Sequence, residues 1–305
     1  VAYPGTSAAS LYPDNATDAK LAREQNALVV YVHPFVAPPP DPINDPSLTN
    51  AFPVDAALGL VDYYEVICLA DHRASSEVWY LLMNCGLRIA AAGGTDAMAN
   101  YASLRGPLGI NRTYVMPRGS RNTPEQRRDE WLDALRQGRS FATNGPLLDF
   151  RVDGHWPGEE LTLPVGEHEL EYSGFVRSAI PVEHVEVVWN GDVVARFETD
   201  SDGRQATISG VVPASESGWL LLRAWSGEAN RLLFDMYPYA TTTPVWVNIG
   251  NSVPTSVSDA EYFLAWVRRL EESAAGHPDY NSDDERTRIL DHLSAARTRF
   301  EQCLR

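Results

Sequence analysis

The chain of 305 residues is 44% hydrophobic and 10% aromatic, which is enough apolar surface for two or three cores and excludes an intrinsically disordered chain. Its net charge of −16 at pH 7 argues against a nucleic acid partner, because phosphate groups would repel it. No apolar run reaches the ~18 residues of a membrane helix, so we expect no membrane partner.

Up to Asn144 the pattern alternates between helices and strands. The apolar run ALVVYV at 27–32 is typical of a strand buried on both faces, and it follows a polar helix with Asn15 as its predicted N-cap. Strands that alternate with helices predict a largely parallel sheet or barrel. The other elements expected here are strands at 61–69, 87–92 and 111–116 and helices at 75–85 and 123–137, the last capped by Thr123.

Beyond Gly145, seven short apolar segments are separated by tight turns such as Asn190-Gly191. This spacing predicts an antiparallel β-sandwich over residues 145–251. The last part, 252–305, carries two amphipathic helices whose apolar stripes need a partner surface. We therefore expect a helical hairpin that packs on the first part of the chain, residues 1–144, and a fold class of α/β plus all-β.

The cysteines and the start of the chain carry little information about function. Cys68, Cys85 and Cys303 form neither a CxxC pair nor an even-numbered disulfide framework. Cys68 and Cys85 lie in apolar runs, which is typical of buried thiols. The first residues show no pattern of a secretory signal, and the sequence leaves the compartment open, cytoplasmic or exported.

Three predicted strand ends carry side chains that can bind a metal. His33 ends ALVVYV, Glu65 lies in the next strand with His72 just beyond it, and Asp96 follows two glycines at the end of a third strand. In parallel sheets the carboxyl ends of the strands meet at one edge. Imidazole and carboxylate suit zinc, iron or manganese, and such an ion lowers the pKa of bound water from 15.7 to about 7. The pattern therefore predicts a site for hydrolysis, with His33, Asp96 and Glu65 as metal ligands and Asp96 and His72 as catalytic residues.

Each of these residues also has a purely structural interpretation. His33 would then only end a strand, Asp96 would cap a helix and Glu65 would pair with an arginine. His72 would be a solvated loop residue. Two arginines, Arg105 and Arg112, are predicted to bind substrate through their planar donor forks, or else to form structural salt bridges.

Four strings, in this order, resemble a known family: YVHPF, DYYEV, SEVWYLLMNCGLRIAAAGGTDA and LRQGRSFATNGPLLDFRVDG. They are similar to the carbaryl-hydrolase-like (CehA/McbA-type) metallohydrolases of the polymerase-and-histidinol-phosphatase (PHP) superfamily over about residues 1–251. The resemblance implies a distorted, TIM-like α/β barrel with a metal cluster, followed by a β-sandwich. It implies hydrolysis of phosphoester, carbamate or amide bonds in a small-molecule substrate, with His33 and Asp96 as metal ligands.

Two departures from the family pattern keep a second hypothesis open. Met98 stands where the family's late motif has a histidine, and the early His-x-His motif does not occur in this chain. Residues 1–144 would accordingly be the C-terminal half of a PHP-like barrel. One hypothesis is a metal-dependent hydrolase whose site is completed by residues absent from this chain, such as its own N-terminal fragment. On that hypothesis this chain alone would hold its zinc, manganese or iron only in part or not at all. The other is a non-catalytic module in which the β-sandwich binds carbohydrate or protein.

Overall fold

The computed structural model describes residues 10–33, 35, 41, 50–68, 71–97, 108–120 and 122–304. The chain divides into two compact units. Unit 1 comprises Val1–Val29, Pro40–Val61 and Thr255–Arg305, and unit 2 comprises Val30–Pro39 and Asp62–Pro254. This grouping differs from the three successive domains predicted from the sequence, because segments distant in the chain share each core.

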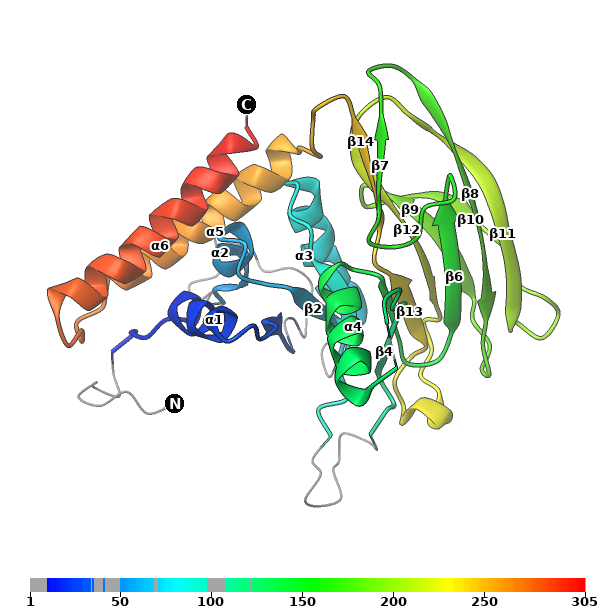
Figure 1. The fold of residues 1–305 in the computed structure, drawn as a ribbon, viewed down its shortest axis with the longest axis horizontal. Helices are drawn as coiled ribbons and strands as arrows, with labels where there is room; N and C mark the ends of the chain where they lie inside the picture. The colour runs from blue at the N-terminus through cyan, green and yellow to red at the C-terminus, as the bar shows by residue number, and fades with distance from the viewer. Residues whose placement is uncertain are drawn as a thin grey trace. The chain divides into compact units, whose positions relative to one another are not determined.

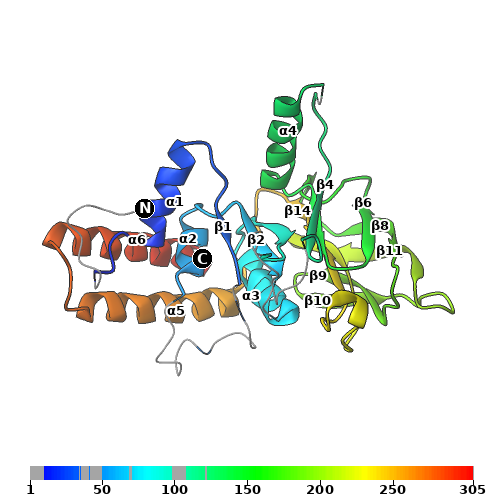
Figure 2. The same ribbon diagram turned by 90° about the horizontal axis from the view of Figure 1, so that it is seen from below.

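Unit 1 is helical. It contains α1 (Asn15–Glu24), α2 (Phe52–Ala57), α5 (Val257–Gly276) and α6 (Asp283–Gln302). Helices α5 and α6 run side by side as a hairpin and contact α2 (Figures 1 and 2). The cap of α1 is Asp14, whose side chain accepts a hydrogen bond from the Thr17 N–H, so the prediction of Asn15 as the cap was wrong by one residue.

The hairpin is held by the two predicted apolar stripes. Phe263 on α5 stacks on Phe300 of α6, with ring centroids 5.0 Å apart. The Trp266 indole N–H donates to the carbonyl of Asn50, 2.9 Å away, which ties the hairpin to the segment before α2. All members of the stripes are buried, as the helical spacing predicted: Phe263, Trp266, Val267, Leu270, Ile289, Leu293, Ala296 and Phe300.

Unit 2 begins with a three-stranded parallel sheet in the order β1-β2-β3, of which β1 and β2 are labelled in Figure 2. Its strands are β1 (Val30–Tyr31), β2 (Tyr63–Ile67) and β3 (Ala90–Gly93), and α3 (His72–Asn84) connects the last two. The predicted parallel α/β pattern is present. Strand β1 is shorter and less buried than expected, because among the described strands it lies at the edge of the sheet and pairs with β2 alone. Within the described residues this sheet does not close into a barrel.

The rest of unit 2 is mainly antiparallel. One sheet has the strand order β10-β9-β12-β13-β5-β4, with β14 and β7 attached through β12, and the other has the order β11-β8-β6. Both contribute to one core that includes Phe150 and Leu170 from one sheet and Val187 and Leu222 from the other. The two sheets therefore form a β-sandwich. The elements are α4 (Pro124–Arg136), β4 (Arg112–Val115), β5 (Ser140–Thr143), β6 (Leu147–Val152), β7 (Glu160–Leu163), β8 (His168–Arg177), β9 (His184–Trp189), β10 (Asp192–Arg196), β11 (Gln205–Ala214), β12 (Gly218–Trp225), the 3₁₀ turn η1 (Arg231–Leu233), β13 (Tyr239–Thr242) and β14 (Val245–Ile249).

Strands β4 and β5 cross the boundary that the sequence placed near residue 145. They precede it in the chain, yet β5 pairs with β13 of the large sheet. The Ser140 hydroxyl of β5 also donates to the carbonyl of Ala91 in β3, 3.0 Å away, and the Ala91 N–H donates to the Thr243 hydroxyl. These side-chain bonds join the parallel sheet to the large sheet and hold β3 in place.

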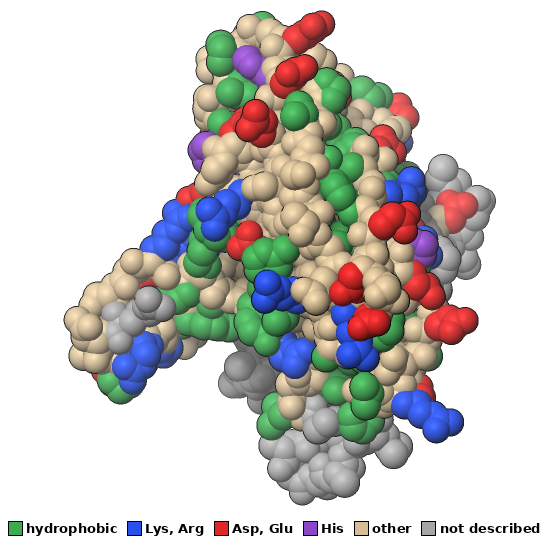
Figure 3. Space-filling view, turned by 90° about the vertical axis from the view of Figure 1, so that its right-hand side faces the viewer, with side chains coloured by type: hydrophobic (Ala, Val, Ile, Leu, Met, Phe, Trp, Pro, Cys, Tyr) green, Lys and Arg blue, Asp and Glu red, His purple; other side chains and the backbone are tan. Residues whose placement is uncertain are grey.

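Two further properties of the molecule concern a membrane or a nucleic acid as its partner. Among the described helices none is long and apolar enough to span a bilayer. On the face shown in Figure 3, which is the side where β6, β8 and β11 lie in Figure 1, acidic and basic side chains are interspersed. The expectation of neither nucleic acid nor membrane as a partner stays a prediction.

Candidate metal centre

Side chains from all three parallel strands converge at the carboxyl edge of the β1-β2-β3 sheet. His33 follows β1, Glu65 lies in β2 and Asp96 follows β3. The His33 Nε2 atom is 3.3 Å from Asp96 Oδ2, although β2 lies between the strands that carry them. A ligand atom of each of His33, Glu65 and Cys68 lies within 4.8 Å of the other two.

Both His33 and Asp96 have left-handed backbone conformations, with φ of 49° and 53°. Such conformations are uncommon outside glycine, although His and Asp tolerate them better than most residues. Each costs of order 1–3 kcal/mol and is maintained only where the surroundings impose it. Hydrogen bonds hold the backbone next to both residues: the Asp71 N–H donates to the Phe35 carbonyl, 2.9 Å away, and the Thr95 hydroxyl donates to the Asn111 carbonyl. Paired strain of this kind is typical of functional sites.

The second glycine of the GGTD string makes room for the Glu65 carboxylate. A Cβ atom built on Gly94 would lie 1.8 Å from Glu65 Oε1, far inside any real contact distance. The Gly94 carbonyl accepts a hydrogen bond from the Asn111 side-chain amide at 2.9 Å, and the Gly94 N–H donates to the carbonyl of Ile67. This loop is therefore shaped around the carboxylate of β2.

Glu65 is a carboxyl group with an incomplete set of partners. Burial raises its pKa to about 7, and the hydrogen bond from the His33 backbone N–H offsets only part of this effect. Its Oε2 atom is buried and has no hydrogen-bond partner among the described residues. A carboxyl group in such a place is stable only if it is protonated or if a cation lies beside its ionised form. The structural interpretation, a salt bridge to an arginine, is not observed in the described part of the chain.

Cys68 is the member of this group that the sequence did not indicate as a site residue. Its prediction as a buried thiol is confirmed, with 1% of its surface exposed. In a regular strand, residues 65 and 68 would point to opposite faces. The β2–β3 register shifts between Glu65 and Ile67, and the strand ends there, so both side chains reach His33. No signal in the sequence predicts this shift.

His72 lies apart from this group. It is the first residue of α3 and is buried, with its ring centroid 4.9 Å from that of Tyr237 and 5.7 Å from that of Tyr239. Burial lowers the pKa of the ring to about 4 against the opposing charge of Asp71, so the imidazole is neutral at pH 7. The alternative of a solvated loop histidine was wrong. The catalytic role predicted for His72 stays a prediction.

Of the two arginines predicted to bind substrate, only Arg112 lies within the described residues. Arg112 is the first residue of β4 and is half-buried beside β3, with its carbonyl 3.0 Å from where a Cβ on Gly93 would stand. Its Nε is buried and has no hydrogen-bond partner among the described residues. Arg105 and Met98 lie outside the described residues. The substrate-binding roles of both arginines stay predictions.

The donor set fits a divalent cation. The ligand atoms of one tetrahedral zinc ion lie roughly 3.5 Å apart, given bond lengths of about 2.0–2.3 Å. The His33–Asp96 separation of 3.3 Å already matches this, and the group of His33, Glu65 and Cys68 needs to contract by little more than about 1 Å. Imidazole, carboxylate and thiol together suit zinc or iron.

A second feature with binding potential lies in the β-sandwich. It is a pocket of about 300 Å³ at the end of the inter-sheet space, where Tyr114 of β4 stacks on Phe141 of β5 with centroids 4.9 Å apart and rings within 10° of parallel. The pocket is lined by Tyr114, Val115, Met116, Arg139, Ser140, Phe141, Leu148, Asp149, Phe150, Trp156, Pro157 and Thr242. Most of its lining is apolar or aromatic, as in sites for small organic ligands.

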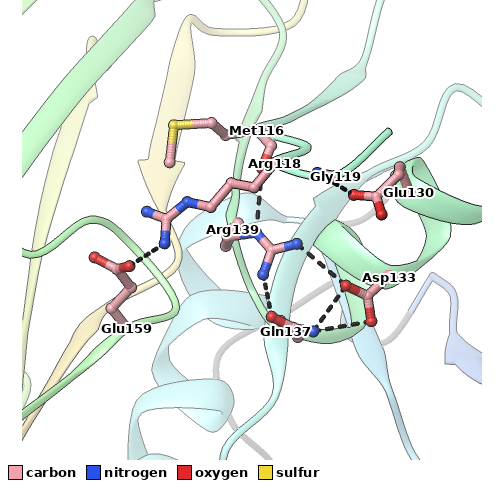
Figure 4. Close-up of polar contacts among 8 residues, drawn as sticks. All are labelled: Met116, Arg118, Gly119, Glu130, Asp133, Gln137, Arg139 and Glu159. Carbon is pink, nitrogen blue, oxygen red and sulfur yellow. Dashed lines mark hydrogen bonds and ion pairs between the residues drawn. The ribbon is translucent and has the colours of Figure 1, made fainter. Parts of the chain in front are cut away.

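The arginines near this pocket are neutralised by their neighbours (Figure 4). The Arg139 guanidinium donates to the Met116 carbonyl at 3.1 Å and to Asp133 at 3.2 Å, and it also bonds Gln137. Arg118 pairs with Glu159. Because both guanidinium groups are already engaged, the pocket favours a neutral ligand over an anionic one.

No protein-family model matches the chain, and comparison with curated proteins gives no significant match. The resemblance to the PHP metallohydrolases therefore stays a hypothesis, and the function has to be argued from the site itself.

Proposed function

We propose that unit 2 carries the metal site of a metal-dependent hydrolase that cleaves phosphoester, carbamate or amide bonds. The observation that supports this most lies at one edge of a parallel sheet, where His33 is 3.3 Å from Asp96 and within 4.8 Å of Glu65 and Cys68. His33 and Asp96 also have left-handed backbones. In this proposal the β1-β2-β3 sheet is part of a PHP-type barrel. The remaining strands and the His-x-His ligands would come from residues absent from this chain.

Each residue has a proposed role in the site. His33 and Asp96 would bind the cation with Glu65 as a third ligand, and the cation would supply a water molecule with a lowered pKa. The Glu65 pKa of about 7 means that ligation releases a proton near neutral pH. The second oxygen of Asp96, whose side chain is about a third exposed, would accept the proton of the attacking water. The half-buried Arg112 guanidinium would hold a substrate oxygen.

Metal analysis tests this function. The chain is incubated with Zn²⁺, Mn²⁺ or Fe²⁺ and dialysed, and its metal content is compared with that of a His33→Ala/Asp96→Ala variant. A matched control is His155→Ala/Asp202→Ala, which removes the same residue types from the sandwich. We expect the site variant to lose the metal and the control to keep it. Equal metal content in the chain and the site variant would contradict the proposal.

A second candidate function, a carbohydrate-binding module, is supported by the aromatic pocket of the sandwich. Tyr114, Phe141 and Trp156 line it, and aromatic faces stack on sugar rings while the half-buried Asp149 accepts hydrogen bonds from hydroxyls. Titration calorimetry with a panel of mono- and disaccharides tests this function. Binding should be lost in Trp156→Ala and retained in Trp131→Ala, a substitution of an exposed tryptophan on α4. Absence of binding by every sugar would exclude it.

A further inference from the structure

We infer that Cys68 is a thiolate ligand of the proposed metal centre, which would make the site selective for zinc, cobalt or iron(II) over magnesium and manganese. The inference depends on the proposed function, because it concerns the same ion. It adds a donor of a different chemical kind, and it predicts which metals the chain retains.

The position of Cys68 is the first argument. It follows β2 directly, and its sulfur lies within 4.8 Å of a ring nitrogen of His33 and a carboxylate oxygen of Glu65. Among the described residues no other cysteine shares such a group. Cys85 is equally buried in the same unit, at the end of α3, and is not among the metal-capable groups found in the described chain. The two cysteines therefore form a natural comparison.

The chemistry of the surroundings is the second argument. A cysteine that only fills a core is surrounded by apolar atoms, whereas Cys68 stands beside a buried carboxylate that lacks a hydrogen-bond partner for Oε2. Two adjacent anions, thiolate and carboxylate, are stable there only with a cation between them. A divalent cation bound by both groups would remove that repulsion, and it would displace a proton from each of them as it binds.

The number and the chemical kind of the ligand atoms determine which metal ions the site would hold. His33, Glu65 and Cys68 are three ligands, the number in a catalytic zinc site, and their ligand atoms lie within 4.8 Å of one another. Asp96, 3.3 Å from the Nε2 atom of His33, is a further potential donor. Thiolate is a soft ligand that magnesium and manganese do not favour, so these ions should bind only weakly.

Cobalt spectroscopy tests the inference on the whole chain. Co²⁺ bound by a thiolate has a charge-transfer band in the near ultraviolet, and Co²⁺ bound only by nitrogen and oxygen lacks it but keeps visible d–d bands. The chain is titrated with Co²⁺ beside Cys68→Ser and the matched control Cys85→Ser. We expect the near-ultraviolet band in the parent chain and in Cys85→Ser, and its loss in Cys68→Ser.

The outcomes separate this inference from the proposed function. Visible bands in all three proteins with no near-ultraviolet band would overturn thiolate ligation and leave the metal site in place. No cobalt spectrum in the parent chain would overturn both. A band that persists in Cys68→Ser would also overturn the inference. If Cys68→Ser does not fold, ¹¹³Cd NMR of the parent chain decides instead, since sulfur ligation moves the resonance strongly downfield and its absence there would refute the role of Cys68.

Discussion

Replacing Gly94 by alanine tests whether the GGTD loop is shaped around the Glu65 carboxylate. The added Cβ would stand 1.8 Å from Glu65 Oε1, whereas real Cβ contacts are essentially never below 3.0 Å. One of the two groups must therefore move by more than about 1 Å. The carboxylate is the end of a flexible side chain, so it is expected to swing away, at the low end of the ~1–3 kcal/mol that overpacking usually costs.

The larger effect of Gly94→Ala should fall on the site. A displaced Glu65 no longer accepts the hydrogen bond from the His33 backbone, and it leaves the group of ligand atoms. We expect zinc affinity, measured by titration calorimetry, to fall in Gly94→Ala, while urea unfolding reports a loss of about 1 kcal/mol. Gly227→Ala is the matched control, because a Cβ there meets no atom within 4 Å.

A double-mutant cycle separates the clash from any other effect of the alanine. Glu65→Ala removes the group that the new Cβ would strike, so Gly94→Ala should cost little in that background. The coupling free energy of unfolding should then be close to the full cost of the single Gly94→Ala substitution. Additive effects of the two substitutions, or unchanged zinc affinity in Gly94→Ala, would refute the account of this loop.

Three further predictions concern pH and packing. Because the folded-state pKa of Glu65 is raised to about 7, the metal-free chain should lose stability as pH rises from about 4.5 to 7, and Glu65→Gln should remove that part of the pH dependence in urea unfolding. His72 acts in the opposite direction: its pKa is lowered to about 4, so its contribution is lost as pH falls from about 6.5 to 4, and an unchanged acid profile in His72→Phe would contradict this. In unit 1, Phe263→Ala should cost about 3–5 kcal/mol by emptying the contact with Phe300, while Val257→Ala, at a position 56% exposed, should be nearly neutral in the same thermal unfolding assay.

Much of the candidate site could be predicted from the sequence because its members stand at strand ends. His33 and Asp96 follow apolar runs in an α/β pattern, and parallel strands bring such ends to one edge whatever the rest of the fold does. Glu65 was included because its strand, which lies next in the α/β pattern, ends at the same edge. Cys68 was not, because its approach to His33 depends on a register shift in β2 that leaves no trace in the local pattern.

The grouping of the elements into units also depends on contacts that a local sequence pattern does not reveal. Periodicity identified the β-sandwich and the apolar stripes of α5 and α6, since each is a local repeat of 2 or 3.6 residues. The stripes also indicated a partner surface within residues 1–144, but not that α2 provides it, nor that β4 and β5 join the large sheet, because those pairings join segments far apart in the chain.

The sequence by itself therefore determined the types of elements, the buried stripes and the chemical kinds of side chain at the strand ends, all of which depend on neighbouring residues. Only the tertiary structure decided the distances among His33, Glu65, Cys68 and Asp96, the left-handed turns that allow them and the space at Gly94. The physical reason is that these features arise where strands distant in sequence meet. Burial then changes the chemistry of the side chains that are brought together there, as when it raises the pKa of Glu65.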